Sequence, residues 1–166
     1  MLEITPYRIT QQNELVSMIL EIQQNEFNIP ITAKDQPDLY MIDAFYRKNG
    51  GEFWTATHNG TVVGSIALIK ISNRCGVIRK MFVKKEFRGK EFCIAQKLLD
   101  KLVDYSIHSE IGTLYLGTID KLKAALRFYE KNDFLLIDKA QLPIDFPVME
   151  VDNVFCRRHL KSPVNN

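Results

Sequence analysis

The spacing of apolar and polar residues along the chain predicts a mixed α+β protein. Alternating apolar positions bounded by turn residues predict strands over residues 2–9, 53–58, 61–71, 75–83, 113–118, 134–137 and 148–160. Apolar residues at helical spacing predict four helices. One is capped by Thr10 and ends before Pro30, one covers residues 35–47, one runs from the loop after Val83 to residues 106–109, and one contains residues 122–129.

The order of these elements predicts the sheet. The three strands over residues 53–83 form an antiparallel meander, and Asn59-Gly60 suits a type I′ turn because both turn residues need a positive φ. Only the strand–helix–strand unit over residues 77–118 requires a parallel crossover. We therefore expect one domain over residues 1–160, with a mixed, mostly antiparallel sheet, helices on both faces, and a polar C-terminal tail over residues 161–166.

The stretch over residues 77–100 combines an apolar strand, a short basic loop and a long amphipathic helix. The first N–H groups of a helix have no partners within it, and the helix dipole adds partial positive charge at that end. Such a turn binds anions, and cations beside it strengthen the effect. Here those cations are Lys84, Lys85, Arg88 and Lys90. We predict that this turn binds the pyrophosphate of a cofactor.

Composition narrows the classes of function. The formal net charge is only +2, so no broad basic field indicates nucleic acid as a partner. Cys75, Cys93 and Cys156 show neither metal-ligand nor CxxC spacing, so we predict no metal site and no disulfide framework, and we expect a reducing cytoplasm. The N-terminus has no signal-type apolar segment, and no apolar run approaches the roughly 20 residues that span a bilayer, so no membrane association is predicted.

Two groups of residues resemble motifs of one known family. Met81-Phe82-Val83, Phe87-Arg88-Gly89-Lys90 and the helical residues 95–99 resemble motif A of the GCN5-related N-acetyltransferases (GNAT). Residues 125–134, ALRFYEKNDF, resemble motif B, A-x-x-F-Y-E-K-x-G-F. The order of elements resembles the family over residues 4–160. The resemblance implies a GNAT acyl-CoA N-acyltransferase fold and an N-acetyltransferase that moves acetyl from acetyl-CoA to a primary amine.

The resemblance also implies a site. The strand that ends at Val83 and the strand over residues 114–118 would diverge into a V-shaped opening that holds acetyl-CoA. The amine would attack the thioester directly, a backbone amide would stabilise the oxyanion, and Tyr129 of motif B would give a proton to the leaving thiolate. The cofactor-binding residues would be Met81, Phe82 and Val83 from the strand, and Arg88, Gly89, Lys90, Glu91, Phe92, Cys93 and Ile94 from the loop.

Three positions depart from the family pattern. Glu91 and Cys93 stand where the family prefers small residues, and a carboxylate at Glu91 would repel a diphosphate unless it points to solvent or pairs with a cation. Val77 occupies the position where a glutamate commonly acts as base, so the base is unassigned, with water or Asp120 as candidates. Leu122 replaces a frequent asparagine, which some members replace with methionine.

Two further questions stay open in the sequence. A degenerate family member that binds acyl-CoA or a protein partner without turnover is the alternative to the enzyme. The acceptor could be a small amine, an amino acid, an antibiotic or a peptide terminus, since its expected side of the cleft contains residues as mixed as Phe27, Tyr40, Tyr46 and Phe146. Dimers are common for this fold, so the resemblance allows a homodimer.

Overall fold

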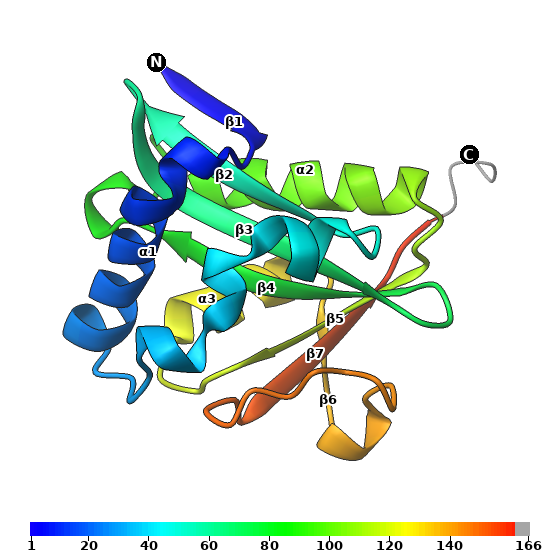
Figure 1. Cartoon of the computed structure of the whole chain (residues 1–166). Helices are drawn as coiled ribbons and strands as arrows, with labels where there is room; N and C mark the ends of the chain where they lie inside the picture. The colour runs from blue at the N-terminus through cyan, green and yellow to red at the C-terminus, as the bar shows by residue number, and fades with distance from the viewer. Residues whose placement is uncertain (162–166) are drawn as a thin grey trace.

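The computed structural model describes residues 1–161 and contains one seven-stranded sheet in the order β1-β2-β3-β4-β5-β7-β6 (Figure 1). All neighbouring strands are antiparallel except β4 and β5, which are parallel. The predicted mixed, mostly antiparallel sheet is therefore confirmed. The strands are β1 (Leu2–Pro6), β2 (Glu52–His58), β3 (Thr61–Ile71), β4 (Cys75–Val83), β5 (Thr113–Thr118), β6 (Leu135–Ile137) and β7 (Val154–His159).

Helices cover both faces of the sheet, as predicted. Figure 1 shows α1 (Gln12–Leu20) and the short segments that follow it on one face, and α2 (Ile94–His108) with α3 (Lys123–Lys131) on the other. The remaining helical segments are short 3-10 or π turns. They are η1 (Ile9–Gln11), η2 (Glu21–Glu26), η3 (Ala33–Asp35), η4 (Pro37–Tyr40), η5 (Asp43–Arg47), η6 (Lys85–Phe87) and η7 (Lys139–Gln141).

Each face of the sheet has its own hydrophobic core. The predicted stripe of α2 is buried, since Leu98, Leu99 and Leu102 are fully inaccessible to solvent and pack with residues of β2–β5. On the opposite face, Leu15 and Ile19 of α1 are likewise fully buried and belong to a second cluster. A two-sided sheet of this kind must be apolar on both faces, which explains why the central strands read as nearly continuous apolar runs.

The predicted hairpin between β2 and β3 is confirmed. Asn59 and Gly60 have φ values of 51° and 84°, the left-handed values that a type I′ turn requires. Asn59 tolerates this conformation better than most residues, and Gly60 has no Cβ to clash.

Several predicted boundaries are wrong. The helix predicted over residues 35–47 is broken into η3, η4 and η5, because Gln36 and Met41 leave the helical region, with φ, ψ values of −131°, 58° and −146°, 49°. Thr10 is not a helix cap. It lies within η1, whose N-cap is Arg8, and η1 leads directly into α1. The first strand ends at Pro6, and the last begins only at Val154 because residues 148–153 form a loop.

A buried polar network joins the short helical segments to β4. Gln23 and Gln36 exchange two amide hydrogen bonds of 3.0 and 2.9 Å. The Lys80 ammonium donates to Gln36 at 2.5 Å and lies 3.7 Å from the Asp38 carboxylate, which also accepts a 2.5 Å hydrogen bond from the Tyr46 hydroxyl. The network thus fixes residues 23–46 against the strand that forms one wall of the site.

Burial disfavours the charged form of Lys80, the cation of this network. Lys80 is buried, and this desolvation lowers the pKa of its ammonium from 10.5 to about 8, against the opposing effect of Asp38. Between those two pH values the unfolded chain keeps a proton that the folded chain has lost. Linkage then requires the free energy of unfolding to rise with pH across this window.

The predicted rise of the unfolding free energy with pH can be measured. The reference is the double variant Lys80→Met/Asp38→Asn, which removes both charges together and leaves no unpaired ion. Relative to it, the wild type should gain about 1–3 kcal/mol of unfolding free energy between pH 8 and pH 10. Urea denaturation at pH 7, 8, 9 and 10 provides the measurement, and parallel pH profiles would show that Lys80 keeps an ordinary pKa.

Candidate functional site

The neighbouring strands β4 and β5 pair over only part of their length. Their parallel register runs from Cys75↔Thr113 to Ile78↔Leu116 and stops there. Beyond this point β4 stays with β3, while Gly117 and Thr118 stay with β7. The strands therefore separate, and the expected V-shaped opening is present between them.

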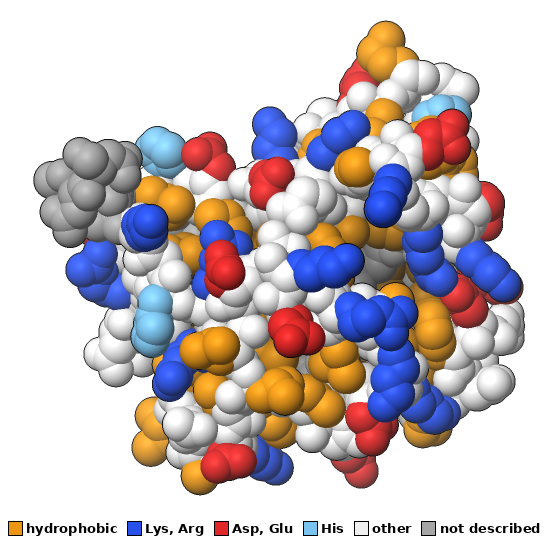
Figure 2. All heavy atoms as spheres, turned by 180° about the vertical axis from the view of Figure 1, so that it is seen from behind, with side chains coloured by type: hydrophobic (Ala, Val, Ile, Leu, Met, Phe, Trp, Pro, Cys, Tyr) orange, Lys and Arg blue, Asp and Glu red, His pale blue; other side chains and the backbone are white. Residues whose placement is uncertain are grey.

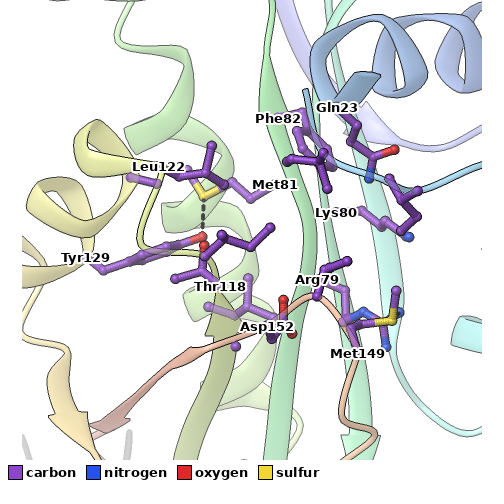
Figure 3. A pocket seen from close by; sticks show the side chains of 17 residues that line it. Gln23, Arg79, Lys80, Met81, Phe82, Thr118, Leu122, Tyr129, Met149 and Asp152 are labelled. Atoms are coloured by element: carbon purple, nitrogen blue, oxygen red, sulfur yellow. Dashed lines mark hydrogen bonds between the residues drawn. The ribbon is translucent and has the colours of Figure 1, made fainter. Parts of the chain in front are cut away.

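A cavity of about 110 Å³ lies at this separation (Figure 3). Its walls come from both strands, from α3, from the loop before β7 and from the segment after α1. The residues that face it include Gln23, Ile31, Arg79, Lys80, Met81, Phe82, Gly117, Thr118, Tyr129, Met149 and Asp152.

A β-bulge shapes the β4 wall of the cavity. Two residues of β4, Lys80 and Met81, lie opposite Ile66 of β3, and Lys80 has a positive φ of 54°. The Ser65 hydroxyl stabilises this distortion by donating to the Lys80 carbonyl at 2.7 Å. Past the bulge, Phe82 and Val83 pair with β3 along one edge only, so the other edge has no strand partner in the described chain, and there the Val83 carbonyl accepts a hydrogen bond from Arg88.

Tyr129 reaches the cavity from α3. Its side chain is buried, and its hydroxyl donates to the Met81 sulfur at 3.3 Å, a weak acceptor (Figure 3). Burial is the main cause that raises the pKa of the Tyr129 phenol well above its usual 10. The hydroxyl therefore carries its proton at neutral pH, as a proton donor must.

The loop between β4 and α2 leaves several backbone donors free. Gly89 has a φ of 108° and Cys93, the N-cap of α2, has a left-handed φ of 52°. No side chain caps α2, and within residues 1–161 the N–H groups of residues 89–92 donate no hydrogen bond. A concave row of free N–H groups at a helix start is suited to an anion.

The side chains of this loop mostly face solvent. Lys90, Glu91 and Cys93 are exposed, and Glu91 lies within ion-pair distance of no cation in the described part of the chain. The Glu91 side chain therefore points to solvent and does not pair with a cation within residues 1–161. Figure 2 shows Lys and Arg side chains gathered on the right of the rear face, the side on which this loop lies in that view.

Two contacts hold the loop in place. Phe92 packs with Phe87 and with His58 of the β2–β3 hairpin, at ring distances of 5.2 and 5.6 Å. Arg88 donates from Nε to the Val83 carbonyl at 2.8 Å and binds both oxygens of Glu26 at 2.5 and 2.7 Å. The Arg88 hydrogen bonds are the main cause that lowers the pKa of the Glu26 carboxyl. Arg88 therefore ties the loop to η2 through the ion pair of its guanidinium with Glu26.

Asp152 is a cavity residue that sequence reasoning missed. Burial raises the pKa of its carboxyl from 3.8 to about 6, against the lowering effect of Arg79 and Lys80. The stretch over residues 148–160 read as a strand, so no sequence signal placed Asp152 beside Tyr129. The alternative base Asp120 is exposed and does not face the cavity, and Val77 is buried in a separate cluster with Phe146 and Phe155.

The expected acceptor-side aromatics do not line this cavity. Tyr46 is buried beneath the helical segments, Phe146 packs on Phe155, and Tyr40 is exposed. Gln23, Ile29 and Ile31 face the cavity instead. The segment after α1 therefore presents an amide and two aliphatic side chains to the cavity.

No group of three or more His, Cys, Asp or Glu side chains within residues 1–161 is arranged to hold a metal ion. No helix in that range has the length and apolar character needed to cross a membrane.

Comparison with known proteins agrees with this geometry. Residues 16–134 match the family model described as Acetyltransferase (GNAT) family. The crystal structure of a GNAT-family acetyltransferase from Staphylococcus aureus Mu50 is similar at 43% identity and a TM-score of 0.94, over 97% of this chain and 100% of that chain. An acetyltransferase from Streptococcus agalactiae 2603 is similar at 29% identity and a TM-score of 0.92, over 96% and 98% of the two chains.

A more distant structure shares the fold. The PaiA N-acetyltransferase from Thermoplasma acidophilum, in complex with coenzyme A, has 16% identity and a TM-score of 0.74, over 96% of this chain and 99% of that chain. The sequence has no match among proteins with curated descriptions. The family match covers most of the chain, and the Staphylococcus aureus structure covers nearly all of it. The chain therefore belongs to the GNAT family of acetyltransferases.

Proposed function

We propose that this protein transfers the acetyl group of acetyl-CoA to a primary amine by direct attack. The observation that carries the proposal is the separation of β4 from β5 at a cavity that Tyr129 enters from α3. The free N–H groups of residues 89–92 lie at the end of β4 where the cofactor's pyrophosphate would sit. Family membership supports an acyl-CoA N-acyltransferase, and the acetyl donor and amine acceptor are our proposal.

The cofactor would run from the phosphate loop along the open edge of β4. Backbone groups of Phe82 and Val83 would pair with its pantetheine amides, which places the thioester near the bulge at Lys80. A backbone N–H on this edge would stabilise the oxyanion that forms when the amine attacks the carbonyl carbon. Tyr129 would then protonate the thiolate as the C–S bond breaks, which suits a hydroxyl that keeps its proton at neutral pH.

Binding and turnover separate this proposal from its alternative. Acetyl-CoA should raise the thermal unfolding midpoint, because a ligand that binds only the folded state stabilises it. An amine panel of polyamines, amino acids, aminoglycosides and peptides should then identify an acceptor through release of free CoA thiol. Acetyl-CoA binding without thiol release for any amine would support a binding module, and no binding at millimolar acetyl-CoA would overturn the proposed enzyme.

The role of Tyr129 is tested by Tyr129→Phe, which removes only the hydroxyl. We expect kcat to fall about 10- to 100-fold while the Kd for acetyl-CoA stays unchanged, since a thiolate needs only modest acid assistance. Tyr115→Phe, on β5 and outside the cavity lining, is the matched control and should leave kcat unaltered. Equal turnover in wild type and Tyr129→Phe would reduce Tyr129 to a core residue.

The role of the phosphate loop is tested at Glu91. Glu91→Gln removes one exposed negative charge beside the proposed pyrophosphate site, so the Kd for acetyl-CoA should fall about two- to fivefold at low ionic strength. Glu110→Gln makes the same charge change beyond the far end of α2 and should have no effect. Calorimetric titration at two salt concentrations checks both variants, and an unchanged Kd for Glu91→Gln would place the diphosphate away from this side chain.

A further inference from the structure

The base that the family pattern leaves unassigned has a candidate in the loop before β7. Asp152 faces the same cavity as Tyr129, and Figure 3 shows its carboxylate in the space between β5 and the Arg79 side chain of β4. This inference rests on the proposed function, because a base is needed only if an amine reacts in the cavity.

Backbone contacts hold the Asp152 loop in a defined position. The Asp152 N–H donates to the Met149 carbonyl at 3.1 Å, and the next residue, Asn153, donates to the Thr118 carbonyl at the end of β5 at 2.9 Å. The Asn153 side chain also accepts a 2.9 Å hydrogen bond from the Asp120 N–H. These contacts fix the carboxylate relative to the strand that forms one cavity wall.

Gly117 of β5 leaves the space that the Asp152 carboxylate occupies. A Cβ at Gly117 of β5 would lie 2.6 Å from the Asp152 Oδ2 atom and 3.1 Å from its Cγ. Both distances are shorter than van der Waals contact allows, so the carboxylate lies directly against the glycine backbone. Any other residue at position 117 would displace it.

The charged groups around Asp152 leave the carboxylate available. Among residues 1–161 it has no hydrogen bond or ion pair through its side chain. Lys80 of β4 is engaged by Gln36 and Asp38, and the Arg79 guanidinium donates to the Met149 sulfur at 2.9 Å. From α3, Tyr129 faces the cavity as a neutral phenol. A partly buried carboxylate without a protein partner is free to accept a proton from a group that enters the cavity.

We propose that Asp152 is the general base of the reaction and accepts the proton of the attacking amine. The acceptor reacts as the neutral amine. Its lone pair forms the N–C bond to the thioester carbonyl while one N–H proton passes to the Asp152 carboxylate. The C–S bond then breaks, the thiolate takes the Tyr129 proton, and both side chains return to their resting states by exchange with solvent. The products are the N-acetylated amine and CoA thiol.

The charge state of the carboxylate fits this role at neutral pH. With a pKa of about 6, Asp152 is ionised at pH 7.5 yet more basic than an exposed carboxylate. As the N–C bond forms, the nitrogen becomes positive and therefore a much stronger acid than the free ammonium. A base of this strength is then sufficient to remove its proton.

Asp152→Asn tests the proposal with little change in shape. With the best amine from the panel and saturating acetyl-CoA, kcat should fall about 100-fold or more, while the Kd for acetyl-CoA stays within twofold of the wild type. The wild-type pH profile of kcat/KM for the amine should show a limb near pH 6 that Asp152→Asn lacks. Glu150→Gln, an exposed change on the same loop, is the control and should retain wild-type kcat.

Stability separates a catalytic role from a structural one. Because the pKa of Asp152 is raised in the folded protein, its ionisation opposes folding above pH 6. Asp152→Asn should therefore unfold at the same or a higher temperature than the wild type at pH 7.5. As a second variant, Gly117→Ala keeps the carboxylate but displaces it, and should also lower kcat.

The outcomes distinguish the two proposals. A wild type that acetylates no amine overturns the proposed function and this inference with it. An active wild type whose Asp152→Asn variant keeps its kcat and its limb near pH 6 overturns only the role of Asp152. A lower kcat together with a lower unfolding temperature and an unchanged pH limb would also overturn it, since the side chain would then be structural.

Discussion

The arrangement of the site depends on how far two parallel strands remain hydrogen-bonded. After the pair Ile78↔Leu116, β4 and β5 have no further ladder contacts, and their backbones follow different partners. Neighbouring strands twist relative to one another, so strands held together at one end separate progressively at the other. The bulge at Lys80 and the antiparallel partner β7 extend this separation. The opening exists because β4 and β5 form no hydrogen bonds with each other beyond that point. Among the described residues this edge of β4 therefore has no strand partner there and can face a ligand.

The polar network around Lys80 costs desolvation free energy, and its position beside the cavity explains its role. A buried ion pair is often no more stabilising than apolar residues of the same volume, and here desolvation lowers the lysine pKa despite its partner. The network instead fixes the position of one segment. The segment over residues 21–47 has short 3-10 and π turns in place of a long second helix, so its hydrogen bonds to β4 hold it against the cavity.

The groups that surround the cavity come from five separate parts of the chain, including Gly117 and Thr118 of β5. β4 contributes its open edge and Arg79, α3 contributes Tyr129, the loop before β7 contributes Asp152, and the segment after α1 contributes Gln23. The two ionisable groups with opposite tasks in our proposal have both been shifted by burial. The raised pKa makes the Asp152 carboxyl more basic, which favours a base role, while burial keeps the Tyr129 phenol protonated and makes it a weaker acid.

The sequence by itself determined the periodic elements and the local motifs. The bounds of β3, β4 and β5 were predicted to the residue, because alternation and turn chemistry are properties of neighbouring residues. The loop over residues 88–94 and Tyr129 were predicted as site residues because their motifs are contiguous. The broken segment over residues 33–47 was not predicted, since the non-helical backbone at Gln36 and Met41 depends on packing against the sheet. Only the tertiary structure placed Asp152 beside Gly117, and Lys80 beside Asp38, because these contacts join residues far apart along the chain and no local pattern encodes them.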